Sequence, residues 1–112
     1  MQFLIIGLDG TDTNAKERRF AARSRHIELG EKLRQSGNLW YGAALLNELG
    51  EMNGSMYLMD FKDRAELQMW LDEEPYITGD VWRTLEIRPA SVRDPWQFSR
   101  PQEFFEARKR DA

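Results

Sequence analysis

Two short segments of this chain carry apolar side chains on both alternations of a β-strand, and they constrain the fold most strongly. They are residues 3–8 and residues 55–61 of a chain of 112 residues. Successive side chains of a strand point to opposite faces of its sheet, so strands of this composition have to be covered on both faces. We therefore expect both segments to be central strands of one sheet.

Two other segments have the periodicity and end signals of helices. The first is capped by Thr13 or Asn14 and runs to about Gln35. The second begins after Asp63, and a glutamate three residues later resembles a capping box. Pro75 ends this helix, because proline disfavours helical geometry in the residue before it.

Strands at residues 39–46 and 81–88 complete the order βαββαβ, with a hairpin loop at residues 50–54 between the second and third strands. This order predicts an α+β, ferredoxin-like sandwich with a four-stranded antiparallel sheet. In that fold the second and fourth strands lie at the edges. The fourth segment suits an edge, since it carries Thr84, Glu86 and Arg88 on one alternation.

The predicted sheet has a face that its two helices leave open. Half of the central apolar side chains would lie on that face, in a patch larger than monomers usually expose. We expect a second copy to cover it in a two-fold dimer. The alternative is that the chain after Pro89 folds back over the sheet. That tail is polar except for aromatic residues between Trp96 and Phe105.

We accordingly expect residues 1–89 to form one domain and residues 90–112 to form a C-terminal extension. The aromatic residues predict that the extension docks on this domain or on the partner subunit, and a short charged helix can follow at residues 102–110. The alternative is a disordered charged end, which is common at chain termini.

The composition excludes several functional classes. The formal net charge is −3, from 16 basic and 19 acidic residues, which argues against nucleic-acid binding. There is no cysteine, so disulfides, thiol catalysis and thiolate metal sites are absent. No apolar run is long enough to cross a bilayer, and no charged segment precedes the first apolar run as in a signal peptide. We expect a cytoplasmic protein that uses no metal and no cofactor, since no phosphate-binding glycine motif occurs either.

His26 is the only histidine, and it lies on the inward face of the first predicted helix. Ala22, Leu29 and Leu33 share that face at helical spacing. An imidazole titrates near neutral pH, so His26 is a candidate general acid and base. The alternative is a structural histidine whose hydrogen bonds are satisfied by a backbone carbonyl or a nearby acid.

Four further residues are candidates for the same site. Glu74 precedes a proline at a helix end, where its carboxylate can point into a cleft and orient the histidine. Arg19 and Arg23 lie seven and three positions before the histidine, along one side of its helical face. They can hold an anionic substrate, or else form a solvated edge paired with acids. Tyr76 can donate a hydrogen bond to a ligand, or can be a packing aromatic residue.

Taken together, these landmarks resemble the YciI-like (YCII-related) family over nearly all of residues 1–89. The resemblance rests on Arg23, His26, residues 37–39, Gly54-Ser55, Trp70, the tripeptide Glu74-Pro75-Tyr76 and residues 81–89. It implies a dimeric α/β barrel of two ferredoxin-like subunits, in the superfamily of muconolactone isomerase and small monooxygenases. It also implies that the active-site pair of the family, a histidine and the aspartate of an Asp-Pro-Tyr motif, falls on His26 and Glu74. The chain departs from the family pattern in having glutamate for aspartate, and Ala43-Ala44 where Gly-Pro is frequent.

The resulting functional prediction is a small-molecule enzyme that transfers protons without a cofactor. The reaction would be an isomerisation, a lyase reaction or a dehydrohalogenation of a small carbonyl or phenolic compound. The alternative is a non-catalytic dimeric module that binds a ligand or a partner, in which the cleft has lost its chemistry.

Overall fold

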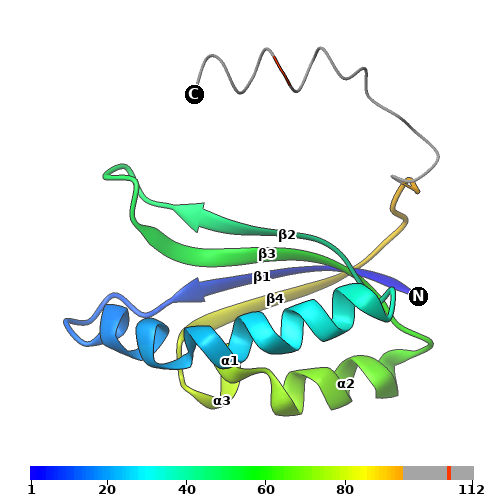
Figure 1. Cartoon of the computed structure of the whole chain (residues 1–112), viewed down its shortest axis with the longest axis horizontal. Helices are drawn as coiled ribbons and strands as arrows, with labels where there is room; N and C mark the ends of the chain where they lie inside the picture. Colours follow the sequence, from blue (N-terminus) through cyan, green and yellow to red (C-terminus); the bar gives the residue numbers. More distant parts are fainter. Residues whose placement is uncertain (95–105, 107–112) are drawn as a thin grey trace.

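The structure is a computed structural model that describes residues 1–94 and Glu106. Its elements follow the order β1, α1, β2, β3, α2, α3, β4 (Figure 1). Their bounds are β1 Gln2–Asp9, α1 Ala15–Gln35, β2 Leu39–Leu46, β3 Met52–Asp60, α2 Arg64–Glu73, α3 Pro75–Thr78 and β4 Trp82–Ala90. The four strands form one antiparallel sheet in the order β2-β3-β1-β4. This is the α+β, ferredoxin-like fold that the sequence predicts.

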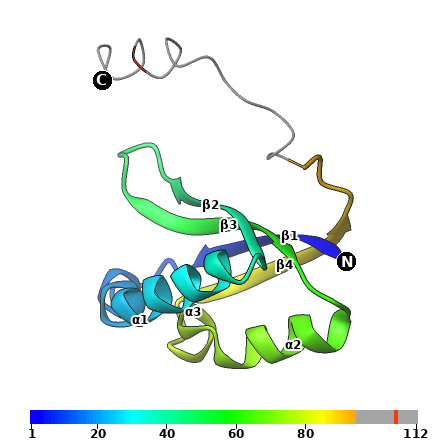
Figure 2. The ribbon, with the colours of Figure 1, turned by 45° about the vertical axis from the view of Figure 1, so that its right-hand side comes forward.

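The two central strands are β1 and β3, as their composition predicts. Phe3 and Ile5 of β1 and Met59 of β3 lie on the face covered by the helices, where they are almost completely buried. On the opposite face Leu4 pairs with Leu58, and Ile6 pairs with Met56. Figures 1 and 2 show α1 and α2 on the same face of the sheet, so no described helix covers those pairs.

The core lies between the sheet and the two long helices. Ala22 of α1 and Leu67, Trp70 and Leu71 of α2 are buried against the central strands. Trp70 also lies beside Phe61, with ring centroids 6.0 Å apart. Burial of a large apolar side chain stabilises a fold by about 1.5–3 kcal/mol. This packing fixes α1 and α2 relative to β3, and the candidate site lies where these three elements meet.

The loop between β2 and β3 lies at residues 47–51, earlier in the chain than the predicted loop at residues 50–54. β3 begins at Met52, and the turn is closed by Asn47, whose side-chain oxygen accepts hydrogen bonds from the amides of Leu49 and Glu51. Of the two glycines assigned to the loop, Gly50 has φ +80° and lies in the turn, whereas Gly54 pairs within the sheet. This strand position requires glycine, because a Cβ there would lie 2.8 Å from the carbonyl oxygen of Gly7.

The segment after α2 also differs from the prediction. Pro75 ends α2 as expected, but it also occupies the first turn of the short helix α3. Proline suits that position because its missing amide would have no helical partner there. The expected cap at Asp63 is confirmed, since its carboxylate accepts a hydrogen bond from the amide of Glu66 at 2.9 Å. The predicted docking of Trp96 to Phe105 lies outside the described residues.

Candidate functional site

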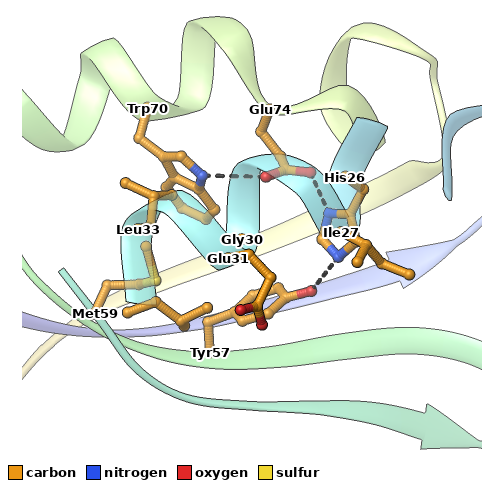
Figure 3. Close-up of a pocket in the computed structure, with 10 residues that line it drawn as sticks. His26, Ile27, Gly30, Glu31, Leu33, Tyr57, Met59, Trp70 and Glu74 are labelled. Carbon is orange, nitrogen blue, oxygen red and sulfur yellow. Dashed lines mark hydrogen bonds and ion pairs between the residues drawn. The ribbon is translucent and has the colours of Figure 1, made fainter. Parts of the chain in front are cut away.

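His26 of α1 and Glu74, at the junction of α2 and α3, are in direct contact. Nδ1 of the imidazole and Oε1 of the carboxylate form a hydrogen bond (Figure 3). The side chain of Glu74 is only 2% exposed and that of His26 is 13% exposed. A buried carboxylate is costly unless it is paired and hydrogen-bonded, so this contact accounts for part of its stability in the interior.

The carboxylate of Glu74 has two further hydrogen-bond donors. The indole nitrogen of Trp70 donates to Oε2 at 3.1 Å, and the amide of Tyr76 donates to Oε1 at 3.1 Å. Glu74 has extended backbone geometry (φ −63°, ψ 119°) because it ends α2 and caps α3. Its side chain therefore points inward from a helix junction and is held on both oxygens, which fixes the orientation it imposes on His26.

The second ring nitrogen of His26 faces Tyr57 of β3. The hydroxyl of Tyr57 lies 2.6 Å from Nε2. With Nδ1 donating to an ionised carboxylate, Nε2 of a neutral imidazole is an acceptor, so the phenol donates this hydrogen bond. Burial raises the pKa of the Tyr57 hydroxyl above its ordinary value, which keeps it a neutral donor. Glu74, His26 and Tyr57 thus form one continuous hydrogen-bonded chain (Figure 3).

Tyr76 and Trp82 enclose the imidazole. The ring of Tyr76 is stacked on that of His26, and the ring of Trp82 meets it edge-on with centroids 6.1 Å apart. The indole nitrogen of Trp82 donates to the hydroxyl of Ser55 at 3.3 Å. Burial also raises the pKa of the Tyr76 hydroxyl. His26 is therefore held by packing as well as by hydrogen bonds.

Arg19 is engaged by the protein itself. It is 8% exposed, and its Nη1 atom lies 2.9 Å and 3.0 Å from the two carboxylate oxygens of Asp9. Its Nη2 atom lies 3.3 Å from the carbonyl oxygen of Gly54 and 3.4 Å from Oγ of Ser55. The guanidinium also lies over the ring of Tyr76, 4.8 Å from its centroid. It is not the solvated edge that the sequence offered as an alternative, and its guanidinium packs against the ring of Tyr76.

Arg23 differs from Arg19 in being exposed. Within residues 1–94, no hydrogen bond or ion pair is formed by its guanidinium. It lines the same side of the site as Arg19 and Tyr76. Of these two arginines, Arg23 is the one whose guanidinium N–H groups remain available for an anion.

Two hollows meet at His26 and Tyr57. The first, the apolar hollow, has a volume of about 160 Å³ and is bounded by Leu33, Leu39, Met59 and Trp70 beside Glu74. The second, the arginine hollow, has a volume of about 180 Å³ and is bounded by Arg19, Arg23, Ser55, Tyr76 and residues 42–44. His26, Ile27 and Tyr57 line both. Ala43 and Ala44, where the chain departs from the family pattern, therefore border the arginine hollow.

The family is established by comparison of the whole folded region. A family model, that of the YCII-related domain, matches residues 1–91. The chain belongs to the YCII-related family. The resemblance that the sequence motifs indicate is thereby confirmed, and the matched region ends one residue after β4. No protein with a curated description matches this chain.

Two solved structures share the fold of this YCII-related chain. One is a 5-chloro-2-hydroxyhydroquinone dehydrochlorinase from Burkholderia phenoliruptrix AC1100 in complex with 2,5-dihydroxybenzoquinone. Its sequence is 18% identical and the TM-score is 0.70; the match covers 81% of this chain and 94% of the dehydrochlorinase chain. The other is a dimeric ferredoxin-like protein of unknown function from Jannaschia sp. CCS1; it is 12% identical, with a TM-score of 0.51, over 81% of this chain and 98% of its own. Both likenesses support the fold.

The sequence did not identify Tyr57 as a residue of the YCII-related site. A signal was available, because Tyr57 lies between Ser55 and Met59 on the alternation of β3 that faces the helices, and a hydroxyl there needs a partner. Gly42 on β2 is a related signal. A Cβ at Gly42 would lie 2.9 Å from the Tyr57 ring, so glycine leaves the space that this ring occupies.

Two findings bear on ligands and membranes. In the part of the chain that the structure describes, no group of three histidine, aspartate or glutamate side chains is arranged to bind a metal ion. Over the same residues, no helix is both long enough and apolar enough to span a membrane. The cytoplasmic location expected from the sequence stays a prediction.

Proposed function

We propose that this YCII-related protein is an enzyme that moves a proton on a small, single-ring phenolic or carbonyl compound. His26 is the acid and base, and Glu74 orients it. The observation that carries the proposal is the buried hydrogen bond between these two side chains at the meeting point of two hollows. The two further donors to Glu74, from Trp70 and Tyr76, hold the carboxylate in the orientation in which it contacts His26.

The pair has the arrangement that proton transfer requires. The carboxylate of Glu74 keeps the Nδ1 proton in place, so that Nε2 carries the lone pair that accepts a proton. When Nε2 is protonated, the resulting imidazolium lies beside the negative charge of Glu74 and is stabilised by it. A positioned acid–base group of this kind contributes about 10²- to 10⁴-fold to a rate.

The hollows suit a small ring that bears an ionised or polar group. A cavity of about 150 Å³ with apolar walls accommodates benzene, and the apolar hollow has a volume of about 160 Å³. The exposed guanidinium of Arg23 in the adjoining hollow favours an anionic oxygen on the substrate. The similar fold of a dehydrochlorinase bound to a dihydroxybenzoquinone supports this substrate class.

Two reactions fit this chemistry. In an isomerisation, His26 takes a proton from an O–H or C–H group, the electron pair shifts into the ring system, and the proton returns to another atom. In a dehydrohalogenation, the same electron pair expels halide, so that the products are the unsaturated ring compound and hydrogen halide. Neither reaction requires an electron donor or acceptor.

We also propose that the protein works as a two-fold dimer through the open face of its sheet. The pairs Leu4–Leu58 and Ile6–Met56 place apolar side chains there, and no described helix covers them. The neighbour from Jannaschia is described as dimeric. Sedimentation at micromolar concentration is expected to give a dimer, and replacing Leu58 with lysine is expected to give monomers.

The proposed function is tested by turnover of 5-chloro-2-hydroxyhydroquinone, followed by chloride release, in the wild type and in His26→Gln. Chloride release by the wild type that falls at least about 100-fold in His26→Gln supports the proposal. An Arg25→Gln variant, altered at an exposed neighbouring position, serves as the control. If 2,5-dihydroxybenzoquinone raises the melting temperature of wild type and His26→Gln equally and no chloride is released, the non-catalytic binding module is favoured instead.

A further inference from the structure

The hydrogen bond on Nε2 of His26 has a consequence for how a substrate reaches the base. Nδ1 is held by Glu74, so Nε2 is the nitrogen that remains for chemistry, and the hydroxyl of Tyr57 already lies 2.6 Å from it. A substrate that gave its proton directly to Nε2 would first have to displace this hydroxyl. The geometry also allows the proton to reach Nε2 through the hydroxyl of Tyr57, which then keeps its hydrogen bond to His26.

Tyr57 is accessible to a ligand from both sides. Its side chain lines the apolar hollow and the arginine hollow together with His26. In Figure 3 the ring of Tyr57 comes up from β3, and its hydroxyl points at His26. A ring compound in either hollow would therefore have this phenol beside it.

We propose that Tyr57 is a catalytic residue that exchanges the proton with the substrate and relays it to His26. The inference rests on the proposed function and adds a second proton to its chemical step. As the substrate X–H bond breaks, a new O–H bond forms on Tyr57. At the same time the original O–H bond of Tyr57 breaks, and an N–H bond forms on Nε2. The products of the step are the substrate anion, neutral Tyr57 and an imidazolium paired with Glu74.

This relay agrees with the electrostatics of the site. Burial raises the pKa of Tyr57, so a tyrosinate would be an unfavourable intermediate. In the relay no tyrosinate forms, because one proton arrives as the other leaves. The groups around the phenol are suited to this exchange, since Glu74 stabilises the imidazolium and Arg23, in the arginine hollow, is placed to stabilise a substrate anion.

The backbone of β2 preserves the position of Tyr57. A Cβ at residue 42 would lie 2.9 Å and 3.0 Å from two carbons of the Tyr57 ring. Gly42→Ala therefore displaces the ring and its hydroxyl while leaving the phenol chemically intact. This substitution disturbs the relay by a second route, independent of removing the hydroxyl.

The experiment measures turnover of 5-chloro-2-hydroxyhydroquinone by wild type, Tyr57→Phe, Gly42→Ala and His26→Gln. Arg25→Gln is the control, since Arg25 is exposed on α1 and lies outside both the site and the open face of the sheet. We expect Tyr57→Phe to lower kcat by at least about 100-fold, with a smaller loss for Gly42→Ala and none for Arg25→Gln. In mixtures of light and heavy water, kcat of the wild type is expected to follow the curved dependence of a two-proton step.

The outcomes separate the relay from the proposed function. If Tyr57→Phe retains the wild-type kcat while His26→Gln is inactive, or if the wild type shows the straight-line dependence of a one-proton step, Tyr57 is not a catalytic residue and the proposed function stands. If the wild type releases no chloride, dehydrochlorination fails as the reaction of the proposed function, and the relay tested on that reaction fails with it. Should Tyr57→Phe not fold, as judged by its thermal melting curve, Gly42→Ala decides the question.

Discussion

The ring of Tyr76 lies parallel to the imidazole of His26, with centroids 3.7 Å apart and 8° between the planes. The amide of the same residue donates to Oε1 of Glu74, the oxygen that His26 contacts. One residue thus restrains both members of the pair, through its side chain in one case and its backbone in the other. The Glu-Pro-Tyr tripeptide is therefore a structural unit, in which the tyrosine belongs to the site as much as the acid does.

Replacing Tyr76 separates these two roles. Tyr76→Phe keeps the stacked ring and the backbone donor, so we expect a near-native melting temperature. Tyr76→Ala removes a large buried ring, and we expect it to lower the free energy of unfolding by about 3–5 kcal/mol. Urea unfolding of the two variants measures the difference, and equal losses in both would show that the hydroxyl matters more than the stacking.

Replacing Glu74 with glutamine is expected to exchange the two tautomers of His26. With its carbonyl oxygen kept on the indole N–H of Trp70, the glutamine places its amide nitrogen, a donor, at Nδ1, so Nδ1 becomes an acceptor and the ring proton moves to Nε2. In the serine-protease triad a wrong tautomer lowers kcat on the order of 10⁴-fold. Because His26 is the only histidine, the nitrogen chemical shifts of one imidazole report the change directly.

Glu73→Gln is the matched control for this experiment. Glu73 is the adjacent residue at the end of α2, and it is exposed. We expect the imidazole signals of Glu73→Gln to match those of the wild type. An unchanged Nδ1 signal in Glu74→Gln would contradict the assignment of Glu74 as the group that sets the tautomer.

The fold and the individual candidates His26 and Glu74 were predictable from the sequence because they depend on local patterns, whereas the pairing of the two was implied only by the resemblance to the YCII-related family. Continuous apolar runs identified β1 and β3 as central strands, and helical spacing placed His26 on the inward face of α1. The proline after Glu74 indicated a carboxylate at a helix end. Each of these signals lies within a few residues along the chain.

The remaining parts of the site depend on contacts between distant segments. Tyr57 becomes important only because β3 passes beneath α1, which brings its hydroxyl to His26 across 31 positions of sequence. Arg19 reads as a helix-surface cation, yet it is buried against Asp9, which follows the apolar run of β1. No spacing rule marks either contact. The short helix α3 was missed because proline signals both the end of one helix and the start of the next.

The ion pair of Arg19 and Asp9 predicts a large effect on stability. The two side chains are 10% and 5% exposed, so removing one charge leaves the other buried without an opposite charge beside it. We expect Asp9→Asn to lower the free energy of unfolding by about 3–5 kcal/mol. Asp12→Asn breaks an exposed pair with Arg18 and is expected to cost much less. Similar urea midpoints for the two variants would contradict this account.

The buried phenol of Tyr57 predicts a loss of stability in alkaline solution. Burial raises its pKa above the ordinary value of 10.0, so above about pH 10 the unfolded chain releases a proton that the folded chain retains. The contribution is therefore complete below pH 10 and is lost as the pH rises toward the raised pKa. The slope of stability against pH is expected to differ between wild type and Tyr57→Phe by up to about 1.4 kcal/mol per pH unit. Tyr76, whose pKa burial also raises, contributes equally to both proteins. The free energy of unfolding is measured by urea from about pH 9 to about pH 11. If it depends on pH equally in wild type and Tyr57→Phe, Tyr57 is not protected from ionisation.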